Sequence, residues 1–123
     1  MLAATCAAAP AIAATAPAVA DETPDGSAES EPRARAAVFR SKVRRIPDWG
    51  RSTLRRIAWC ESRDNLRAIG GGGAYRGLYQ FSFSTWRAMG GRGDPAAAPR
   101  SEQTWRAWKL LKNYGSGHWP VCG

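Results

Sequence analysis

The chain has 123 residues, 44% of them hydrophobic, which provides for one modest core and excludes two full domains. Its formal net charge is +8, and the whole excess lies in residues 50–123, where twelve side chains are basic and four are acidic. A cationic domain favours polyanionic surroundings, and charge alone leaves three of them open: nucleic acid, an acidic membrane surface, or a bacterial wall with anionic polymers.

Residues 1–20 have the character of a truncated export signal that is removed from the mature protein, and we expect its true start upstream, because no Lys or Arg precedes the apolar run and Pro10 and Pro17 interrupt it. They are uncharged and rich in alanine, and Ala-Val-Ala at 18–20 fits the small-x-small pattern of a signal-peptidase site. The alanine-rich runs are too short and too weakly apolar to predict a membrane span. Cleavage after residue 20 would discard Cys6 and leave Cys60 and Cys122 as an even pair for an oxidising compartment.

Residues 21–46 are predicted to be a disordered linker. They are rich in Asp, Glu, Pro, Ser, Ala and Arg and contain few large apolar side chains, so burial cannot offset the entropy of ordering them. The composition changes at Pro47. We therefore expect residues 47–123 to form the folded, functional domain.

A first helix is predicted over residues 49–62, with Asp48 or Ser52 as its N-cap. At helical spacing one face carries three apolar residues and then a carboxylate: Leu54, Ile57, Ala58 and Glu61. A carboxyl group held against apolar neighbours has a raised pKa, because loss of water disfavours its charged form, and it can donate a proton near neutral pH. Glu61 is therefore the first candidate for catalysis, against the ordinary alternative of an exposed or ion-paired acid at a helix end.

The middle of the domain is predicted to be short and irregular. The four glycines at 70–73 favour no regular element, whereas the aromatic and glycine mixture over 74–82 indicates a short extended hairpin or loop beside the active cleft. Ser84 is predicted to cap a helix that carries Trp86 and ends at two glycines.

A loop over 92–100 leads to the last helix, which is predicted to start near Ser101 and to end at Gly115. Together these elements predict an α-dominated α+β domain with about three helices and a short irregular β-hairpin. We expect neither a metal nor a cofactor, because His118 has no Cys or carboxylate at ligand spacing and two cysteines cannot build a zinc site.

Four short strings follow one another in this domain: Cys-Glu-Ser at 60–62, Gly-Leu-Tyr-Gln-Phe-Ser at 77–82, Ser-Thr-Trp at 84–86 and Trp-Pro-Val-Cys at 119–122. In this order and spacing they resemble the transglycosylase-like domain of actinobacterial resuscitation-promoting factors. The fold of that domain is similar to that of lysozyme and of soluble lytic transglycosylases. The resemblance covers residues 48–123 nearly end to end and implies a small lysozyme-like domain.

The resemblance implies that Glu61 is the catalytic acid and that Cys60 and Cys122 form a disulfide. It implies that the substrate is the β-1,4 bond between N-acetylmuramic acid and N-acetylglucosamine in peptidoglycan glycan strands. The expected substrate-binding residues are Asn65, Tyr75, Gln80, Thr85 and Trp86, with the rings of Tyr75 and Trp86 as stacking platforms for sugars. The other tryptophans, Trp59, Trp105, Trp108 and Trp119, are predicted to pack in or against the core. We expect the protein to be a secreted or wall-associated monomer, and a cell-wall endopeptidase is a candidate partner.

The chain departs from the family pattern at two places. Gly-Leu-Tyr-Gln at 77–80 replaces the usual Gly-Leu-Gln or Gly-Val-Gln and is closer to the Gly-Leu-x-Gln of lytic transglycosylases. Arg63 and Asp64 replace two glycines that commonly follow Glu-Ser, which changes the charge close to the acid.

Cleavage of a glycosidic bond needs a proton on the leaving oxygen and stabilisation of positive charge at the sugar carbon, and most glycosidases use two carboxylates. The sequence places no second acid well for this role. Asp64 is interpreted as a solvated residue near Glu61, and Asp94 precedes a proline in a loop. Glu102 lies in the first turn of the last helix, where the helix dipole explains an acid. We therefore predict a one-acid mechanism. The substrate's acetamido group supports the cation, and Glu61 then acts as base towards the sugar 6-hydroxyl or towards water.

Two other classes of function stay open. A non-catalytic wall-binding or resuscitation-signalling module would keep the glycan groove without turnover. Binding of nucleic acid through the cationic surface is the third class. The predicted export signal argues against it, so we expect no nucleic-acid partner and no stable membrane insertion.

Overall fold

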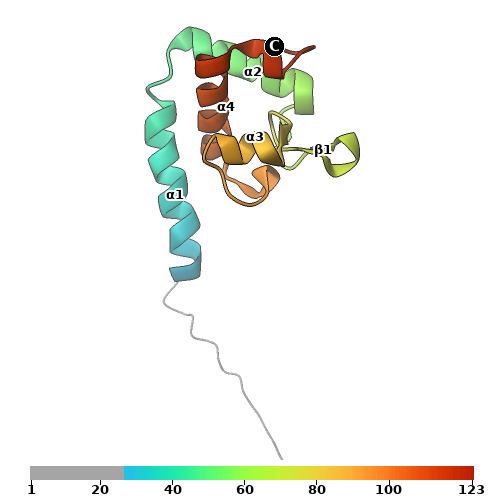
Figure 1. Cartoon of the computed structure of the whole chain (residues 1–123). Helices are drawn as coiled ribbons and strands as arrows, with labels where there is room; N and C mark the ends of the chain where they lie inside the picture. The colour runs from blue at the N-terminus through green and yellow to red at the C-terminus, as the bar shows by residue number, and fades with distance from the viewer. Residues whose placement is uncertain (1–26) are drawn as a thin grey trace, which may run out of the picture. The chain divides into compact units, whose positions relative to one another are not determined.

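The computed structural model describes residues 27–123 and divides the chain into two units, residues 1–33 and 34–123 (Figure 1). The export signal predicted at residues 1–20 lies outside the described part. Within residues 34–123 the structure is dominated by helices and contains one small antiparallel sheet, which confirms the predicted α-dominated α+β class. No helix of residues 27–123 is long and apolar enough to cross a membrane.

Helix α1 spans Ser27–Val43, so the prediction of a disordered linker is wrong for these residues. The part of α1 from residue 34 onward packs on the last helix, through contacts that could not be predicted from amino-acid composition. Phe39 is buried, the Arg35 guanidinium donates to a Glu102 carboxylate oxygen at 2.8 Å, and the Ser101 hydroxyl donates to the Ala36 carbonyl at 3.1 Å. Packing on a neighbour stabilises a helix whose own sequence favours it only weakly.

Helix α2 spans Asp48–Ser62, close to the predicted bounds. Leu54, Ile57 and Ala58 are buried along one face, as the helical spacing predicted. The predicted N-caps are wrong, because Pro47 holds that position without a side-chain cap. At the other end Arg63 adopts the left-handed conformation with φ 55°, and its N–H bonds to the Ala58 and Trp59 carbonyls, which ends the helix.

A three-stranded antiparallel sheet follows, in the order β1 (Ile69–Gly70), β2 (Tyr75–Arg76) and β3 (Phe81–Ser82). The predicted hairpin is present, but the glycine run is more regular than expected. Its first residue belongs to β1 and the next three, Gly71–Gly73, form the 3-10 turn η2 with φ values of 57°, 68° and 104°. Glycine adopts such angles without steric cost, so the tight return from β1 to β2 depends on it.

Helix α3 spans Phe83–Ala88 and is capped by Ser82, not by the predicted Ser84. The Ser82 hydroxyl accepts a hydrogen bond from the Thr85 N–H at 3.1 Å. A short 3-10 turn, η3 (Pro95–Ala97), interrupts the predicted loop before α4 (Arg100–Tyr114), whose bounds agree with prediction. The chain then forms η4 (Ser116–His118) and an irregular tail.

The core lies between α2, α4 and the loop that joins β2 to β3. Leu54, Ile57, Leu78, Trp86 and Ala107 are almost fully enclosed. A buried glutamine on α4, Gln103, completes the contact: its side-chain oxygen accepts from the Leu78 N–H at 2.8 Å and its amide donates to the Ala98 carbonyl at 2.9 Å. Because buried backbone polar groups need partners, this side chain fixes the loop on the helix.

A disulfide joins Cys60 in α2 to Cys122 in the tail, with Cα atoms 5.7 Å apart, and confirms the predicted pairing. The tail is also held by Trp119, which is buried and donates from its indole N–H to the Tyr79 carbonyl at 2.9 Å. The tail therefore lies beside the C-terminal end of α2 and the β2–β3 loop, where it can form one wall of a cleft.

Candidate active site

Glu61 lies in the last turn of α2, next to the disulfide-bonded Cys60. Its side chain is half-buried, and desolvation raises its pKa above the ordinary value of 4.5. Within residues 27–123 no Lys or Arg forms an ion pair with it. Loss of water without a compensating cation favours the protonated form, which is the state that a general acid needs.

The other carboxylates of residues 34–123 all have arginine partners: Asp48 with Arg51, Asp64 with Arg100, Asp94 with Arg76, and Glu102 with Arg35 and Arg106. An arginine nearby favours the ionised state of a carboxyl group. Glu61 is therefore the one acid of this unit that the surroundings favour as a proton donor.

A cavity of about 320 Å³ opens beside Glu61, between the β-sheet and the tail. It adjoins a second cavity of about 240 Å³, since four residues line both: Tyr75, Gln80, His118 and Trp119. The second cavity reaches Thr85 at the start of α3, and a third hollow continues past Thr85 and His118 to Tyr114. The hollows form an extended cleft, which we call the glutamate cleft, with Glu61 at one end.

Tyr75 and Gln80 line the glutamate cleft. Tyr75 stands on β2 with 48% of its surface exposed. Gln80 has a left-handed backbone, φ 52°, and its amide donates to the Gly77 carbonyl at 2.9 Å. The side chain is thus held in place at the cleft edge.

Thr85 also lines the cleft, with its hydroxyl accepting from the Ser82 hydroxyl at 2.9 Å. The expectation for Trp86 is wrong, because the ring is fully enclosed, packs edge-on against Phe81 at 5.1 Å, and donates to the Arg92 carbonyl. A ring without exposed surface cannot stack on a sugar in this structure. Its helix position placed it towards the core.

Asn65 is exposed in the turn after α2 and lines none of the hollows of the glutamate cleft. Its side-chain oxygen accepts from the Arg67 N–H at 2.9 Å, which stabilises the turn. The structure therefore gives Asn65 a local structural contact, and does not bring it into the group of cleft residues.

Two residues that the sequence did not single out for the site belong to the glutamate cleft. His118, predicted to be structural, is exposed on η4 and lines all three hollows, and Tyr114 at the end of α4 lines the third. Their rings meet edge-on at 6.1 Å. No local pattern marks them: Tyr114 ends α4, and His118 belongs to the tail, which the disulfide and Trp119 hold beside the cleft.

Trp59, expected in the core, is 57% exposed and lies under the Arg63 guanidinium at 5.2 Å. It stands on a different face of α2 from Leu54 and Ile57. Trp108 and Trp119 are buried and Trp105 is partly buried, as predicted. Among residues 27–123 no group of three or more metal-ligating side chains comes together.

Comparison with known proteins places these features in a family context. The model of the transglycosylase-like domain family matches residues 50–122. Resuscitation-promoting factor RpfC of Mycobacterium tuberculosis is 48% identical over 67 residues, which are 54% of this chain and 47% of the relative. Resuscitation-promoting factor Rpf of Micrococcus luteus is 43% identical over 70 residues, 57% of this chain and 31% of the relative.

Resuscitation-promoting factor Rpf1 of Corynebacterium glutamicum is 38% identical over 92 residues, 72% of this chain and 46% of the relative. The chain spans less than half the length of each of these curated relatives. The matched residues include α2 with Glu61, the sheet, α3 and α4, and both cysteines of the disulfide.

Proposed function

Because the chain belongs to the transglycosylase-like domain family found in resuscitation-promoting factors, we propose that it cleaves peptidoglycan glycan strands with Glu61 as general acid and base. The proposed target is the β-1,4 bond between N-acetylmuramic acid and N-acetylglucosamine. The observation that carries the proposal is the environment of Glu61, which is desolvated, open to an extended cleft, and without a cation partner in residues 27–123.

In the first step protonated Glu61 donates its proton to the bridging oxygen, and the C1–O bond breaks as positive charge develops at C1. No second carboxylate of the described residues lines the glutamate cleft, so the carbonyl oxygen of the substrate's own acetamido group attacks C1 and forms a cyclic intermediate. Glu61 is left as a carboxylate.

In the second step Glu61 takes a proton from the attacking hydroxyl, which forms the new bond to C1 and releases the acetamido oxygen. Attack by the sugar's own 6-hydroxyl gives an anhydro-sugar end, and attack by water gives a reducing end. Both routes return Glu61 to its protonated form, so one acid completes the cycle.

Three side chains have proposed roles in holding the glycan. The exposed ring of Tyr75 stacks on a sugar face, while Gln80 and Thr85 hydrogen-bond to sugar hydroxyl or acetamido groups. The cationic unit suits a secreted, wall-associated protein, and a wall endopeptidase that cuts the peptide crosslinks is its proposed partner. We propose that it acts as a monomer.

The test compares the full, oxidised chain with Glu61→Gln on purified peptidoglycan, with mass analysis of the released fragments. Asp48→Asn is the matched control, because it removes a carboxylate from the other end of the same helix, where the side chain is almost fully exposed. We expect muropeptides from the wild type and the control and none from Glu61→Gln. Equal release by all three proteins would refute the catalytic role, and the masses of the ends distinguish the two routes.

A non-catalytic wall-binding module is the second candidate, favoured by the lack of a second carboxylate in the cleft among the described residues. It predicts that the wild type and Glu61→Gln sediment equally with insoluble wall and that neither shortens the glycan strands. The same set of proteins therefore decides between the two functions.

A further inference from the structure

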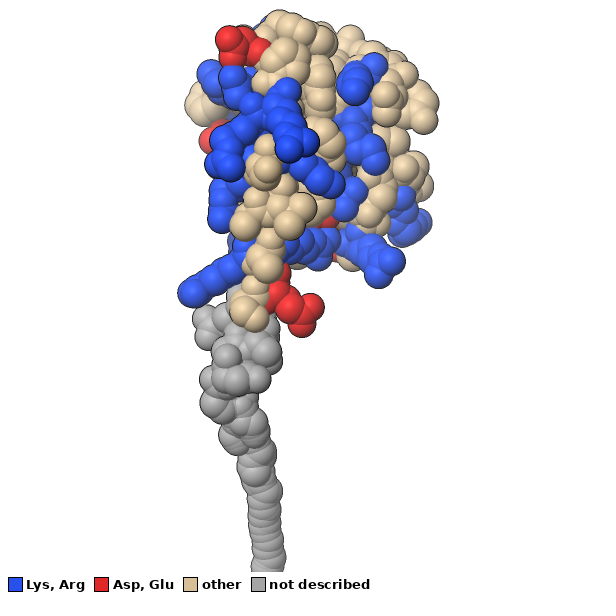
Figure 2. All heavy atoms as spheres, turned by 90° about the vertical axis from the view of Figure 1, so that its left-hand side faces the viewer, with Lys and Arg blue, Asp and Glu red and all other residues tan. Residues whose placement is uncertain are grey.

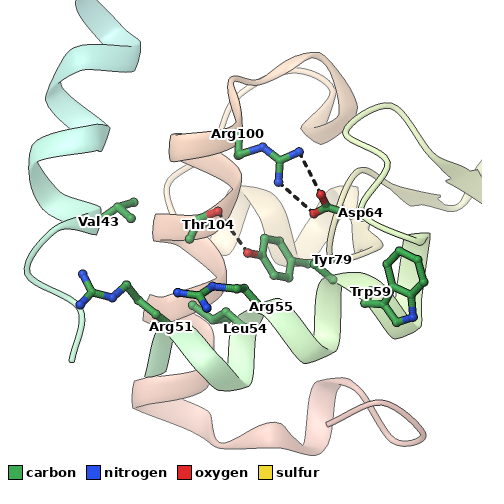
Figure 3. A pocket seen from close by; sticks show the side chains of 10 residues that line it. Val43, Arg51, Leu54, Arg55, Trp59, Asp64, Tyr79, Arg100 and Thr104 are labelled. Atoms are coloured by element: carbon green, nitrogen blue, oxygen red, sulfur yellow. Dashed lines mark hydrogen bonds and ion pairs between the residues drawn. The ribbon is translucent and has the colours of Figure 1, made fainter. Parts of the chain in front are cut away.

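A second concave surface lies between α1, α2 and α4, away from the glutamate cleft. Two hollows of about 410 Å³ each adjoin here, because Val43, Arg100 and Thr104 line both. Five arginines stand around them: Arg40 from α1, Arg44 directly after α1, Arg51 and Arg55 from α2, and Arg100 from α4. We call this surface the arginine groove. Figure 3 shows the hollow between α1 and α2, with Arg51, Arg55 and Arg100 at its rim.

The charge of the arginine groove is only partly neutralised. Arg51 pairs with Asp48 and Arg100 with Asp64, whereas the side chains of Arg40, Arg44 and Arg55 have no hydrogen bond or ion pair to any residue in the part of the chain that the structure describes. The wider surface has the same sign, since residues 34–123 contain 17 basic and 5 acidic side chains. Figure 2 shows Lys and Arg side chains gathered along and beside α1 on this face.

The floor of the groove has a different character from its rim. Val43 is partly exposed and offers aliphatic surface above the buried Leu54 and Ala58, and Thr104 adds a hydroxyl that is hydrogen-bonded to the Tyr79 hydroxyl at 3.1 Å. A ligand that fits both parts carries repeated negative charges and, between them, carbon-rich segments with hydroxyl groups. A polyol or sugar chain joined by phosphodiesters has this pattern.

We propose that the arginine groove binds a phosphodiester-linked anionic polymer of the bacterial wall. Two adjoining hollows suit an extended chain better than a single ion, and guanidinium groups bind phosphate oxygens through paired hydrogen bonds. A flat bilayer surface cannot enter a recessed groove, which favours a polymer over a membrane. The choice of a wall polymer rests on the proposed function, whereas the affinity for phosphodiesters rests on the groove alone.

The groove is distinct from the glutamate cleft. Glu61, Gln80 and His118 line none of its hollows, and Tyr79, which is buried between the two surfaces, is the one residue that lines a hollow of each. Binding to a fixed anionic polymer would hold the protein at the wall while the cleft stays open to the glycan. The groove would thus act as an anchor within the small catalytic unit.

The test measures binding of the full, oxidised chain to poly(glycerol phosphate) by calorimetry at several salt concentrations. The groove variant combines Arg40→Gln, Arg44→Gln and Arg55→Gln. The control variant combines Arg67→Gln, Arg87→Gln and Arg92→Gln, which removes the same charge from exposed positions outside both hollows. We expect the groove variant to bind at least about tenfold more weakly, with a shallower salt dependence, and the control variant to bind nearly as the wild type does.

Equal weakening in the groove and control variants would overturn the proposal, because it would mean that only net charge matters. Tighter groove-dependent binding to a single-stranded DNA oligonucleotide, or to phosphatidylglycerol vesicles, would overturn the choice of a wall polymer. Glu61→Gln should bind poly(glycerol phosphate) as the wild type does. Cleavage of peptidoglycan and binding of the polymer are thus measured separately, so that either proposal can fail while the other stands.

Discussion

At the C-terminal end of α2, Glu61 faces the glutamate cleft without a cation partner in residues 27–123, whereas Arg51 and Arg55 on another face of the same helix stand among further arginines. The first arrangement favours a bound proton, and the second favours a bound anion. If both proposals hold, one helix carries the proton donor on one face and anion-binding arginines on another.

The largest expected effect removes the proton donor. Glu61→Gln should lower the rate of muropeptide release roughly 10²–10⁴-fold, because an amide cannot protonate the leaving oxygen, and this is the usual contribution of general acid catalysis. The rate is measured by chromatography of soluble fragments, with circular dichroism to show an unchanged fold. A variant that keeps the wild-type rate would show that Glu61 is not the proton donor, and the two faces of α2 would no longer differ in function.

The next effect concerns the wall of the glutamate cleft. Replacing Cys60 and Cys122 by serine opens a loop of 62 residues and should lower the free energy of unfolding by about 4 kcal/mol in the chain-entropy model. Urea denaturation of the oxidised wild type and the double variant measures it. Reduction of the wild type is the matched control and should reproduce the loss, and an unchanged midpoint in both would contradict the prediction.

A smaller effect should weaken polymer binding at the arginine groove and leave cleavage at the glutamate cleft unchanged. Glu102 is fully buried and pairs with Arg35 of α1 and with Arg106, so Glu102→Gln should cost about 2 kcal/mol of stability and loosen α1, which forms one wall of the groove. We expect weaker binding of poly(glycerol phosphate) with an unchanged rate of muropeptide release.

Arg35→Gln is the comparison for this variant, because it leaves the carboxylate paired with Arg106 and should therefore cost less stability. A rate of release that falls in step with polymer binding in both variants would show that the two surfaces are one functional unit.

The smallest effect is a dependence on pH. Desolvation raises the pKa of Glu61 above 4.5, so cleavage should decline as the pH rises through this raised value and the acid loses its proton. Glu61 also holds that proton more tightly in the folded chain than in the unfolded chain. Its contribution to stability is therefore complete below the unfolded pKa and is lost between 4.5 and the raised folded value.

Melting temperatures of the wild type and Glu61→Gln, measured from pH 4 to pH 8, test the sign. The wild type should lose stability relative to the variant as the pH rises. The opposite trend would mean that Glu61 is held as a carboxylate, and it would remove the proposed distinction between the two faces.

Much of the fold could be predicted from local patterns. Helical spacing fixed the bounds of α2 and α4 closely, because their apolar faces are regular, and the glycine and aromatic mixture indicated the hairpin. Helix α1 could not be predicted in this way. Its few apolar side chains suffice only because Arg35 finds the buried Glu102 some 67 residues later in the chain.

The candidate site shows the same limit. The structure brings Glu61, Tyr75, Gln80 and Thr85 to one cleft, and short motifs carry all of them except Tyr75. Trp86 was misplaced because a tryptophan in a short motif can face either the cleft or the core, and only packing against Phe81 decides. His118 was missed because a histidine without a metal ligand at suitable spacing was interpreted as structural, although the predicted disulfide brings its tail segment to the cleft.

The position of the disulfide has a consequence for the cell that makes the protein. Cys60 precedes the proposed acid directly, and Cys122 belongs to the tail segment that lines the hollow beside it. If the chain is exported and cleaves glycan as proposed, it is made in a reducing cytoplasm without this disulfide, and we expect it to be inactive there because the tail is not held at the cleft. Oxidation after export would then complete the cleft. Wild-type chain kept in dithiothreitol should accordingly leave peptidoglycan intact. Full cleavage under those conditions would show that activity does not depend on the disulfide.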